Sequence, residues 1–227
     1  MLEDLLSQAT NIEKEAICKH LRIKRTNNVE SINKAYLKAS GHSVVNLFRK
    51  KEMPYKQILI DVADKLNDGI FLTHYKLEDS TKEEEIENKI MNDVENRVKK
   101  MKKEWDKLSP EKKEKKEKNL RNEHAKKGYD TNTMNGVVSM ITTGVVSCLA
   151  ANTVAISIFY TGFFGGLFAN IIGVSLAQLI GGGVIAGAVV AAPLLIALAG
   201  TPAYRKTIPV TILIIQIKNR VKMEKEL

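Results

Sequence analysis

The pattern of apolar and polar positions changes twice along the chain. Up to about residue 78, apolar residues recur every three or four positions in short runs, as on helices that bury one face. Between residues 80 and 128 the chain is highly charged, and one narrow apolar stripe follows helical spacing. From residue 131 to residue 204 the sequence is apolar and rich in glycine. The stripe of the charged segment consists of Ile86, Ile90, Val94, Val98, Met101, Trp105 and Leu108. These periods predict an all-α protein.

Helix start and stop signals divide the first part of the chain into short helices. The segment Thr10-Asn11-Ile12-Glu13 has the spacing of a capping box, in which a hydroxyl and a carboxylate cap the first turn together. Pro54 suits the first turn of a later helix, and Ser109-Pro110 restarts a helix within the charged segment. Isolated helices of this length are marginal in water, so we expect them to pack against each other.

The segment 131–204 contains no Asp, Glu, Lys, Arg or His over 74 residues, and it holds 11 of the 14 glycines. A run of about 18 or more apolar residues already indicates a membrane helix. We expect one span over about 135–160 and a second over about 167–199, interrupted at Gly181-Gly182-Gly183. A transmembrane helical hairpin is preferred, although three crossings stay open.

Basic residues flank the uncharged segment on both sides. The positive-inside rule then places both flanks in the cytoplasm, which requires an even number of crossings. The acidic start of the chain lacks the pattern of a secretory signal. The apolar run before Lys218 is too short to span and predicts an interfacial or bundle-packed helix with basic residues at its end. The flanking residues are Lys126, Lys127, Arg205 and Lys206.

This organisation predicts four parts with different compositions. They are an N-terminal helical domain (1–78), a charged helical stalk (79–130), a glycine-rich apolar membrane hairpin (131–204) and a basic amphipathic tail (205–227). The net charge of +9 is divided between the two sides of the hairpin, with 29 Lys and Arg against 24 Asp and Glu before it, and 6 against 2 after it. The basic part of the stalk is either a solvated surface or a surface that lies on anionic headgroups. Glutamates alternate with its lysines, so nucleic acid is not an expected partner.

Hydroxyl and amide side chains recur every four residues in the first predicted span. Lipid offers these groups no partner, so they should face protein or water. Hydrogen bonding between helices is one interpretation, and the lining of a water-filled path in an oligomer is the other. The residues are Asn135, Ser139, Thr143 and Ser147, followed by Thr153, Ser157 and Thr161.

Two pairs of glycines four residues apart predict close helix packing in the hairpin, and with it a homo-oligomer. The pairs are Gly162 with Gly166, and Gly183 with Gly187. The sequence shows no catalytic pattern. His20, His42, His74 and His124 share no spacing, and neither a zinc signature nor a phosphate-binding loop is present. We therefore expect no enzyme, no catalytic residue, no metal and no cofactor.

Three segments carry a family resemblance. They are Ser40-Gly41-His42-Ser43-Val44-Val45-Asn46-Leu47-Phe48-Arg49, Tyr55-Lys56-Gln57-Ile58-Leu59-Ile60-Asp61-Val62-Ala63-Asp64-Lys65-Leu66, and Ala203-Tyr204-Arg205-Lys206-Thr207-Ile208-Pro209. In this order and spacing the chain resembles the YaaW family of uncharacterised bacterial proteins. The resemblance implies no established activity. It implies only a loose link to ubiquinol–cytochrome c chaperones, and the uncharged segment here is longer and more apolar than in a usual member.

The leading functional hypothesis is a membrane-inserting, oligomerising protein that permeabilises or depolarises a bacterial inner membrane. Its partner would be a bilayer with anionic headgroups, and its two ends would be cytoplasmic. The alternative is a non-catalytic, membrane-tethered assembly or chaperone factor that binds a protein through the N-terminal helical domain. A helical protein whose uncharged segment forms a large core is the remaining interpretation.

Overall fold

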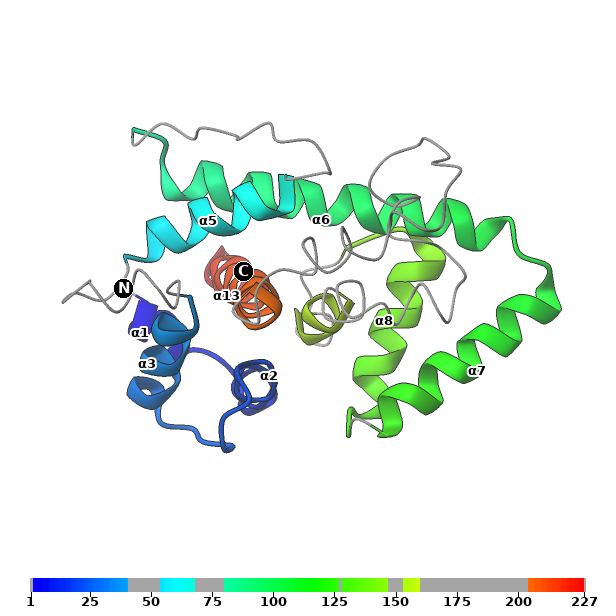
Figure 1. The fold of residues 1–227 in the computed structure, drawn as a ribbon, viewed down its shortest axis with the longest axis horizontal. Helices are drawn as coiled ribbons and strands as arrows, with labels where there is room; N and C mark the ends of the chain where they lie inside the picture. The colour runs from blue at the N-terminus through cyan, green and yellow to red at the C-terminus, as the bar shows by residue number, and fades with distance from the viewer. Residues whose placement is uncertain are drawn as a thin grey trace, which may run out of the picture.

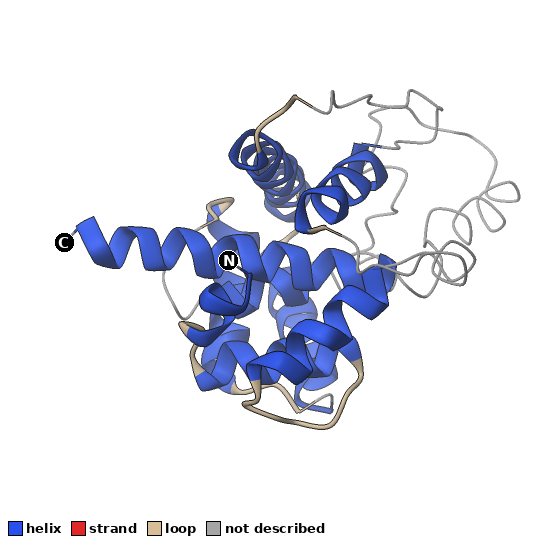
Figure 2. Cartoon of the chain, turned by 90° about the vertical axis from the view of Figure 1, so that its left-hand side faces the viewer, coloured by secondary structure: helices blue, strands red, loops and turns tan. Residues whose placement is uncertain are grey.

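The computed structural model describes residues 2–40, 54–67, 80–126, 128–146, 153–159 and 204–226. All regular secondary structure within these ranges is α-helical, which confirms the all-α prediction (Figure 2). The helices lie around α13 (Tyr204–Glu226), with α5 and α6 on one side and α1, α2 and α3 on the other (Figure 1). The pair α7 and α8 lies beside this arrangement.

Four helices come from the predicted N-terminal domain: α1 (Leu2–Ser7), α2 (Asn11–Leu21), α3 (Val29–Ser40) and α5 (Tyr55–Asn67). The predicted capping box is present, because the Thr10 side chain accepts from the Glu13 N–H and Glu13 accepts from the Thr10 N–H. Helix α2 ends at Arg22, whose φ of 58° is left-handed and whose N–H bonds back to the last turn. Local signals therefore set both ends of α2.

The charged segment forms α6 (Glu83–Asp106) and α7 (Pro110–Lys126). Six residues of the predicted stripe on α6 are buried, and α6 packs against both α5 and α8. On its side facing α5, Arg97 donates to the carbonyl oxygen of Leu66 at 2.6 Å. Helix α6 thus forms one side of the core, whereas Leu120 is the only buried residue among the described side chains of α7.

Helix α8 (Thr131–Thr143) ends well before the end of the first predicted span. Asp130 caps its start by accepting from the Thr133 N–H at 2.9 Å, and Gly144 ends it with a left-handed φ of 74°. A Cβ at Gly144 would lie 2.7 Å from the Lys102 side chain, so both the backbone conformation and the packing favour glycine there.

One continuous helix over 135–160 was therefore a wrong prediction. Residues 144–146 are not helical, and a second helical stretch covers 153–159. A helix of 13 residues is about 20 Å long, well short of a hydrocarbon layer of about 30 Å. Within the described ranges, no helix has both the length and the apolar character needed to cross a bilayer.

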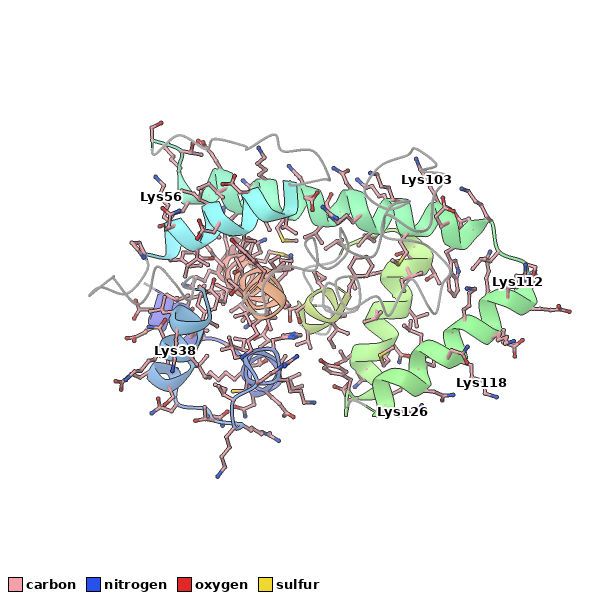
Figure 3. All side chains as sticks on the ribbon, viewed as in Figure 1. Lys38, Lys56, Lys103, Lys112, Lys118 and Lys126 are labelled. Carbon is pink, nitrogen blue, oxygen red and sulfur yellow. The ribbon has the colours of Figure 1, made fainter. Side chains whose placement is uncertain are left out.

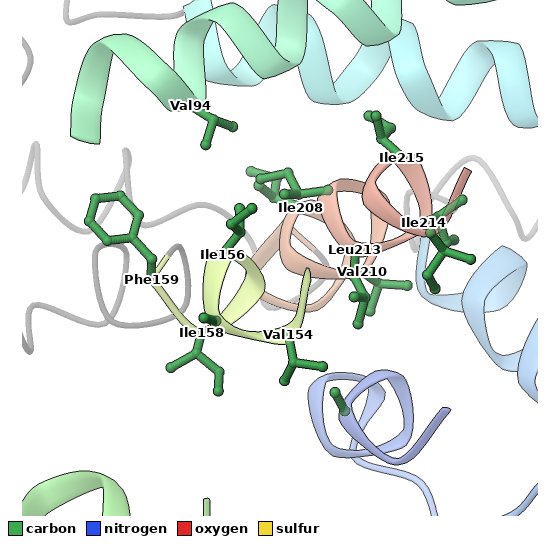
Figure 4. Close-up of a cluster of buried hydrophobic side chains, with 14 of the residues drawn as sticks. Val94, Val154, Ile156, Ile158, Phe159, Ile208, Val210, Leu213, Ile214 and Ile215 are labelled. Atoms are coloured by element: carbon green, nitrogen blue, oxygen red, sulfur yellow. The ribbon is translucent and has the colours of Figure 1, made fainter. Parts of the chain in front are cut away.

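Helix α13 is the central helix of the bundle. Every residue from Thr207 to Ile217 is buried, and α13 contacts α1, α2, α3, α5 and α6. Ile208, Val210 and Leu213 meet Ile156 and Val154 of the 153–159 stretch in one apolar cluster (Figure 4). The sequence left open an interfacial or a bundle-packed helix, and the structure has the bundle-packed one. An amphipathic tail is not observed, because α13 is buried on all sides over three turns.

Candidate functional site

A buried ion pair joins the second helix to the last. Glu13 of α2 and Arg220 of α13 have side chains that are 1% and 8% exposed. Arg220 Nη2 lies 2.9 Å from Glu13 Oε2, and Arg220 Nε lies 3.1 Å from Glu13 Oε1. This two-bond geometry holds the guanidinium in the plane of the carboxylate. Two charges far apart in sequence therefore fix the register of α13 on α2.

The ion pair extends to a third segment. Thr153 donates to Glu13 Oε1 at 3.0 Å, and Arg220 also donates to Glu224 at 2.9 Å and to the Gln8 carbonyl at 3.1 Å. Burial opposes the charge of Arg220, but the hydrogen bonds and charges of Glu13 and Glu224 outweigh it and raise the pKa of Arg220 above its ordinary value. The first residue of the stretch 153–159 is thus attached to the Glu13–Arg220 ion pair.

A second attachment lies one turn further along that stretch, where Ser157 contacts the buried side chain of His20. His20 Nε2 of α2 lies 2.9 Å from Ser157 Oγ, and Ser157 in turn donates to the Val154 carbonyl at 2.7 Å. Burial, followed by the charge of Lys19, lowers the pKa of His20 to about 4, so the ring is neutral near pH 7. The two attachments hold 153–159 along one side of α2.

Helix α3 is joined to the first half of α13 by hydroxyl groups. Tyr36 Oη and Thr211 Oγ1 lie 2.7 Å apart in a buried position, and Thr207 donates to the Ala39 carbonyl at 3.2 Å. Burial, partly offset by the hydrogen bonds, raises the pKa of Tyr36, which keeps the phenol protonated. The hydroxyl groups of Thr207 and Thr211 therefore face partners on α3 instead of water.

On the α5–α6 side, a second ion pair lies at the edge of a surface groove. Lys218 Nζ is 2.6 Å from Glu87 Oε2, and the Tyr55 hydroxyl donates to the other Glu87 oxygen at 3.3 Å. Burial, then the charges of Tyr36 and Glu87, raises the pKa of Tyr55 well above its ordinary value. The groove has a volume of about 420 Å³ and lies between α1 and the end of α13. It is lined by Leu2, Asp4, Leu5, Gln8, Tyr55, Glu83, Lys218, Val221, Lys222 and Lys225.

The predicted polar stripe is split between two environments. Asn135, Ser139 and Thr143 lie together on the exposed side of α8, whose opposite side is buried against α6. Asn135 Oδ1 accepts from Arg121 at 2.9 Å, and Thr143 donates to the Ser139 carbonyl at 2.7 Å. Thr153 and Ser157 instead make the buried contacts with Glu13 and His20. Ser147 and Thr161 lie outside the described residues.

The other predicted positions are only partly covered. All four glycines of the predicted helix-packing pairs lie outside the described residues, as do Gly181-Gly182-Gly183 and the flanking Lys127. Lys126 is exposed at the last residue of α7. Arg205 and Lys206 belong to the first turn of α13, where Lys206 is half-buried. Among the described residues, no group of three His, Cys, Asp or Glu side chains is arranged to hold a metal ion.

Comparisons were made with family models, with curated proteins and with solved structures. None of them gives a match for this chain. The resemblance to the YaaW family stays a prediction, and functional arguments rest on the geometry described above.

The sequence did not point to the Glu13–Arg220 pair as a site. Glu13 was recognised only as the carboxylate of a capping box, and Arg220 only as one of several basic residues after an apolar run. The available signal was weak, namely Lys218 and a single arginine within one helical turn of a run of eleven residues without a charge. These positions are where a buried helix would need partners for its first cations.

Proposed function

We propose that this chain is a membrane-inserting, oligomerising protein that permeabilises a bacterial inner membrane. The observation that carries the proposal is the two-sided character of α8. One side of this uncharged helix packs on α6, and the other presents Asn135, Ser139 and Thr143 at the surface. A helix with hydroxyls and an amide on one face suits the lining of a water-filled path, where these groups keep their hydrogen bonds.

Insertion requires a change from the described conformation, because α8 ends at Thr143. The residues after Gly144 would have to extend the helix, and the stretch 153–159 would have to leave α2. Sequence supports this route, since residues 131–204 contain no charge that would have to enter hydrocarbon. Release of the stretch 153–159 breaks the hydrogen bonds between Thr153 and Glu13 and between Ser157 and His20.

The test is membrane potential in bacterial cells that express the full chain, followed with a potential-sensitive dye. Expression of the unaltered chain is expected to depolarise the cells. Ser139→Leu with Thr143→Leu makes the exposed face of α8 apolar and is expected to abolish depolarisation while the chain stays in the membrane fraction. The matched control is Thr131→Leu with Asn132→Leu, which changes two exposed polar residues of the first turn instead. An intact potential in cells whose membranes contain the unaltered chain contradicts the proposal.

A non-catalytic, membrane-tethered assembly factor is the second candidate, and the groove beside α1 favours it. Its apolar residues, Leu2, Leu5 and Val221, lie between side chains of both charges, as a binding surface for an amphipathic segment of a partner protein requires. This function predicts that Leu5→Asp abolishes co-purification of a membrane partner while the membrane potential never changes. Depolarisation that survives Leu5→Asp favours the first candidate.

A further inference from the structure

Helix α7 has one side that packs and one side that does not. Leu120, 1% exposed, faces the bundle, and Arg121 beside it binds Glu117 on its own helix and Asn135 of α8. The exposed positions follow the opposite side of the helix and end at Lys126. We call this side the outer face of α7, and its residues are Glu111, Lys112, Glu114, Lys115, Lys118, Asn119, Asn122, Ala125 and Lys126. Figure 3 shows Lys112, Lys118 and Lys126 along α7, on the side of the molecule away from α1 and α3.

Three lysines of the outer face differ in their ion pairs from three lysines on and just after α6. On and just after α6, Lys99 pairs with Glu95, Lys102 with Asp106 and Lys107 with Glu104. Lys112, Lys115 and Lys118 form no ion pair with any described carboxylate, and the one described ion pair within α7 joins Glu117 to Arg121. The ammonium groups of Lys112, Lys115 and Lys118 are therefore available to an external anion.

The two helices also differ in net charge. Helix α7 has seven Lys and Arg against four Glu, a net charge of +3, whereas α6 has six against eight acidic residues, a net charge of −2. Glu111 and Glu114 belong to the outer face and reduce its charge without forming a described ion pair with its lysines. Ala125 on this face has only a methyl group, so a partner bound there would be held by charge and not by insertion.

We propose that the outer face of α7 rests on the acidic headgroups of a phospholipid bilayer. The proposal deepens the membrane function proposed above and rests on it for its setting, but it concerns surface binding and not insertion. Each lysine near an anionic surface contributes about 1 kcal/mol, so three of them shift the partition between water and membrane about a hundredfold. The contribution is screened by salt, because the face lies in water.

The test is flotation of the full chain with phosphatidylcholine vesicles that contain or lack phosphatidylglycerol. Lys112→Gln, Lys115→Gln and Lys118→Gln are combined in one variant, since glutamine keeps the helix propensity and removes the charge. The control combines Lys99→Gln, Lys102→Gln and Lys107→Gln, which removes the same charge from ammonium groups that are already paired. Circular dichroism confirms that both variants are folded.

We expect the acidic vesicles to bind the unaltered chain more tightly than neutral ones, with binding that weakens as salt rises. The α7 variant is expected to lose this preference about a hundredfold, and the α6 variant to keep most of it. Equal losses in the two variants would mean that only total charge matters, and this outcome overturns the proposal. Equal loss of binding to a DNA duplex would assign the face to polyanions in general and overturn it as well.

An alkaline carbonate wash separates this proposal from the proposed function. Chain that floats with acidic vesicles but is removed by carbonate is bound to the surface without insertion, so the outer-face proposal stands and the permeabilising function fails. Chain that resists carbonate equally in neutral and acidic vesicles, with no effect of the α7 variant, supports insertion and overturns the role of the outer face.

Discussion

Helices α7 and α13 both carry several lysines and a proline in their first two turns, yet they occupy opposite environments. Helix α13 is buried on all sides from Thr207 to Ile217, whereas the described side chains of α7 include one buried residue, Leu120. The difference follows from where the charges stand. In α13 no charge interrupts the run from Thr207 to Gln216, and in α7 a charge occurs in every turn. Burial of a charge without a partner is costly, so the distribution of charge decides which helix enters the core.

The comparison also shows how a buried helix ends. The first cations after the apolar run of α13, Lys218 and Arg220, are bound by Glu87 and Glu13, whose side chains are 4% and 1% exposed. The lysines on the outer face of α7 need no such partner, because water solvates them. The charges of Lys218 and Arg220 in α13 therefore bind partners within the fold, whereas the lysines on the outer face of α7 face solvent. The following variants test that difference.

The largest effect is expected when one partner of the buried ion pair is removed. Arg220→Met leaves the Glu13 carboxylate buried with its strongest partner gone, which is expected to lower the free energy of unfolding by roughly 3–5 kcal/mol. Arg121→Met removes a half-exposed arginine from α7 and should cost about 1 kcal/mol or less. Urea unfolding followed by the fluorescence of the single, buried Trp105 measures both.

A double variant sharpens this result. Glu13→Leu combined with Arg220→Met removes both charges and should recover a large part of the stability lost in Arg220→Met alone. The contrary result is a loss of free energy of unfolding in the double variant that equals the sum of the losses in Glu13→Leu and Arg220→Met alone. That result would mean that the two residues do not act as a unit.

A cavity in the middle of α13 is expected to cost slightly less. Ile214→Ala removes a fully buried side chain and should lower the free energy of unfolding by about 3 kcal/mol. Asn122→Ala on the exposed side of α7 is the matched change and should stay within about 0.5 kcal/mol. Thermal or urea unfolding of the two variants compares the helices directly, and similar costs at the two positions would contradict the central place of α13.

Acidification tests the attachment of the 153–159 stretch to α2. The pKa of His20 is about 4 in the folded chain and about 6.5 when exposed, so the unfolded chain takes up a proton first as the pH falls. Stability linked to His20 should be constant above pH 6.5 and fall by about 2 kcal/mol between pH 6.5 and pH 5. His20→Gln does not titrate and should lose this part of the pH dependence. An unchanged pH profile in that variant would assign the dependence to other groups.

A smaller effect is expected at the contact between α3 and α13. Thr211→Val keeps the shape of the side chain but removes the hydroxyl that lies 2.7 Å from Tyr36 Oη. The free energy of unfolding should fall by about 1 kcal/mol, because a buried phenol loses a hydrogen bond. Thr131→Val at the exposed start of α8 is the control in the same unfolding measurement. A loss at Thr211 no larger than that at Thr131 would show that the contact with α3 adds nothing.

One substitution in α13 is expected to stabilise the chain. Gln216 is fully buried, its amide nitrogen contacts the Met91 sulfur at 3.3 Å, and its Oε1 has no hydrogen-bond donor in the described structure. Gln216→Met has nearly the same shape and removes the unpaired polar atom, so the free energy of unfolding should rise by about 1 kcal/mol or less. A loss of stability would indicate that Oε1 has a partner outside the described residues.

Local patterns predicted the helices but not their partners. The capping box at Thr10, the stripe on α6 and the helix restart at Pro110 all depend on neighbours within four residues, and all three are present. The Glu13–Arg220 bond joins positions 207 residues apart, and no local pattern marks such a contact. The end of α8 was missed for a related reason, since glycine is frequent in this segment and the packing of Gly144 against Lys102 is a tertiary contact that no local pattern marks.

The prediction for the last helix depended on a length criterion alone. Its apolar run is too short to span a bilayer, and the sequence therefore indicated either a membrane surface or a bundle. The deciding fact is that α1, α2, α3, α5 and α6 together enclose the run, which cannot be inferred before the fold is known. Residues 208–217 would have the same sequence pattern in a helix on a membrane surface and in a helix packed in a bundle.

The central position of α13 has a consequence for biosynthesis. The ribosome makes α1, α2, α3, α5 and α6 before α13. The apolar faces of these helices that α13 covers therefore stay exposed until α13 has been translated. The uncharged segment 131–204 is translated during that interval, when no completed core competes for it. Contacts across so long a stretch of chain also form slowly, because loop closure precedes the gain from burial. A nascent chain of this kind has time to meet a membrane or a chaperone before it can complete its own fold.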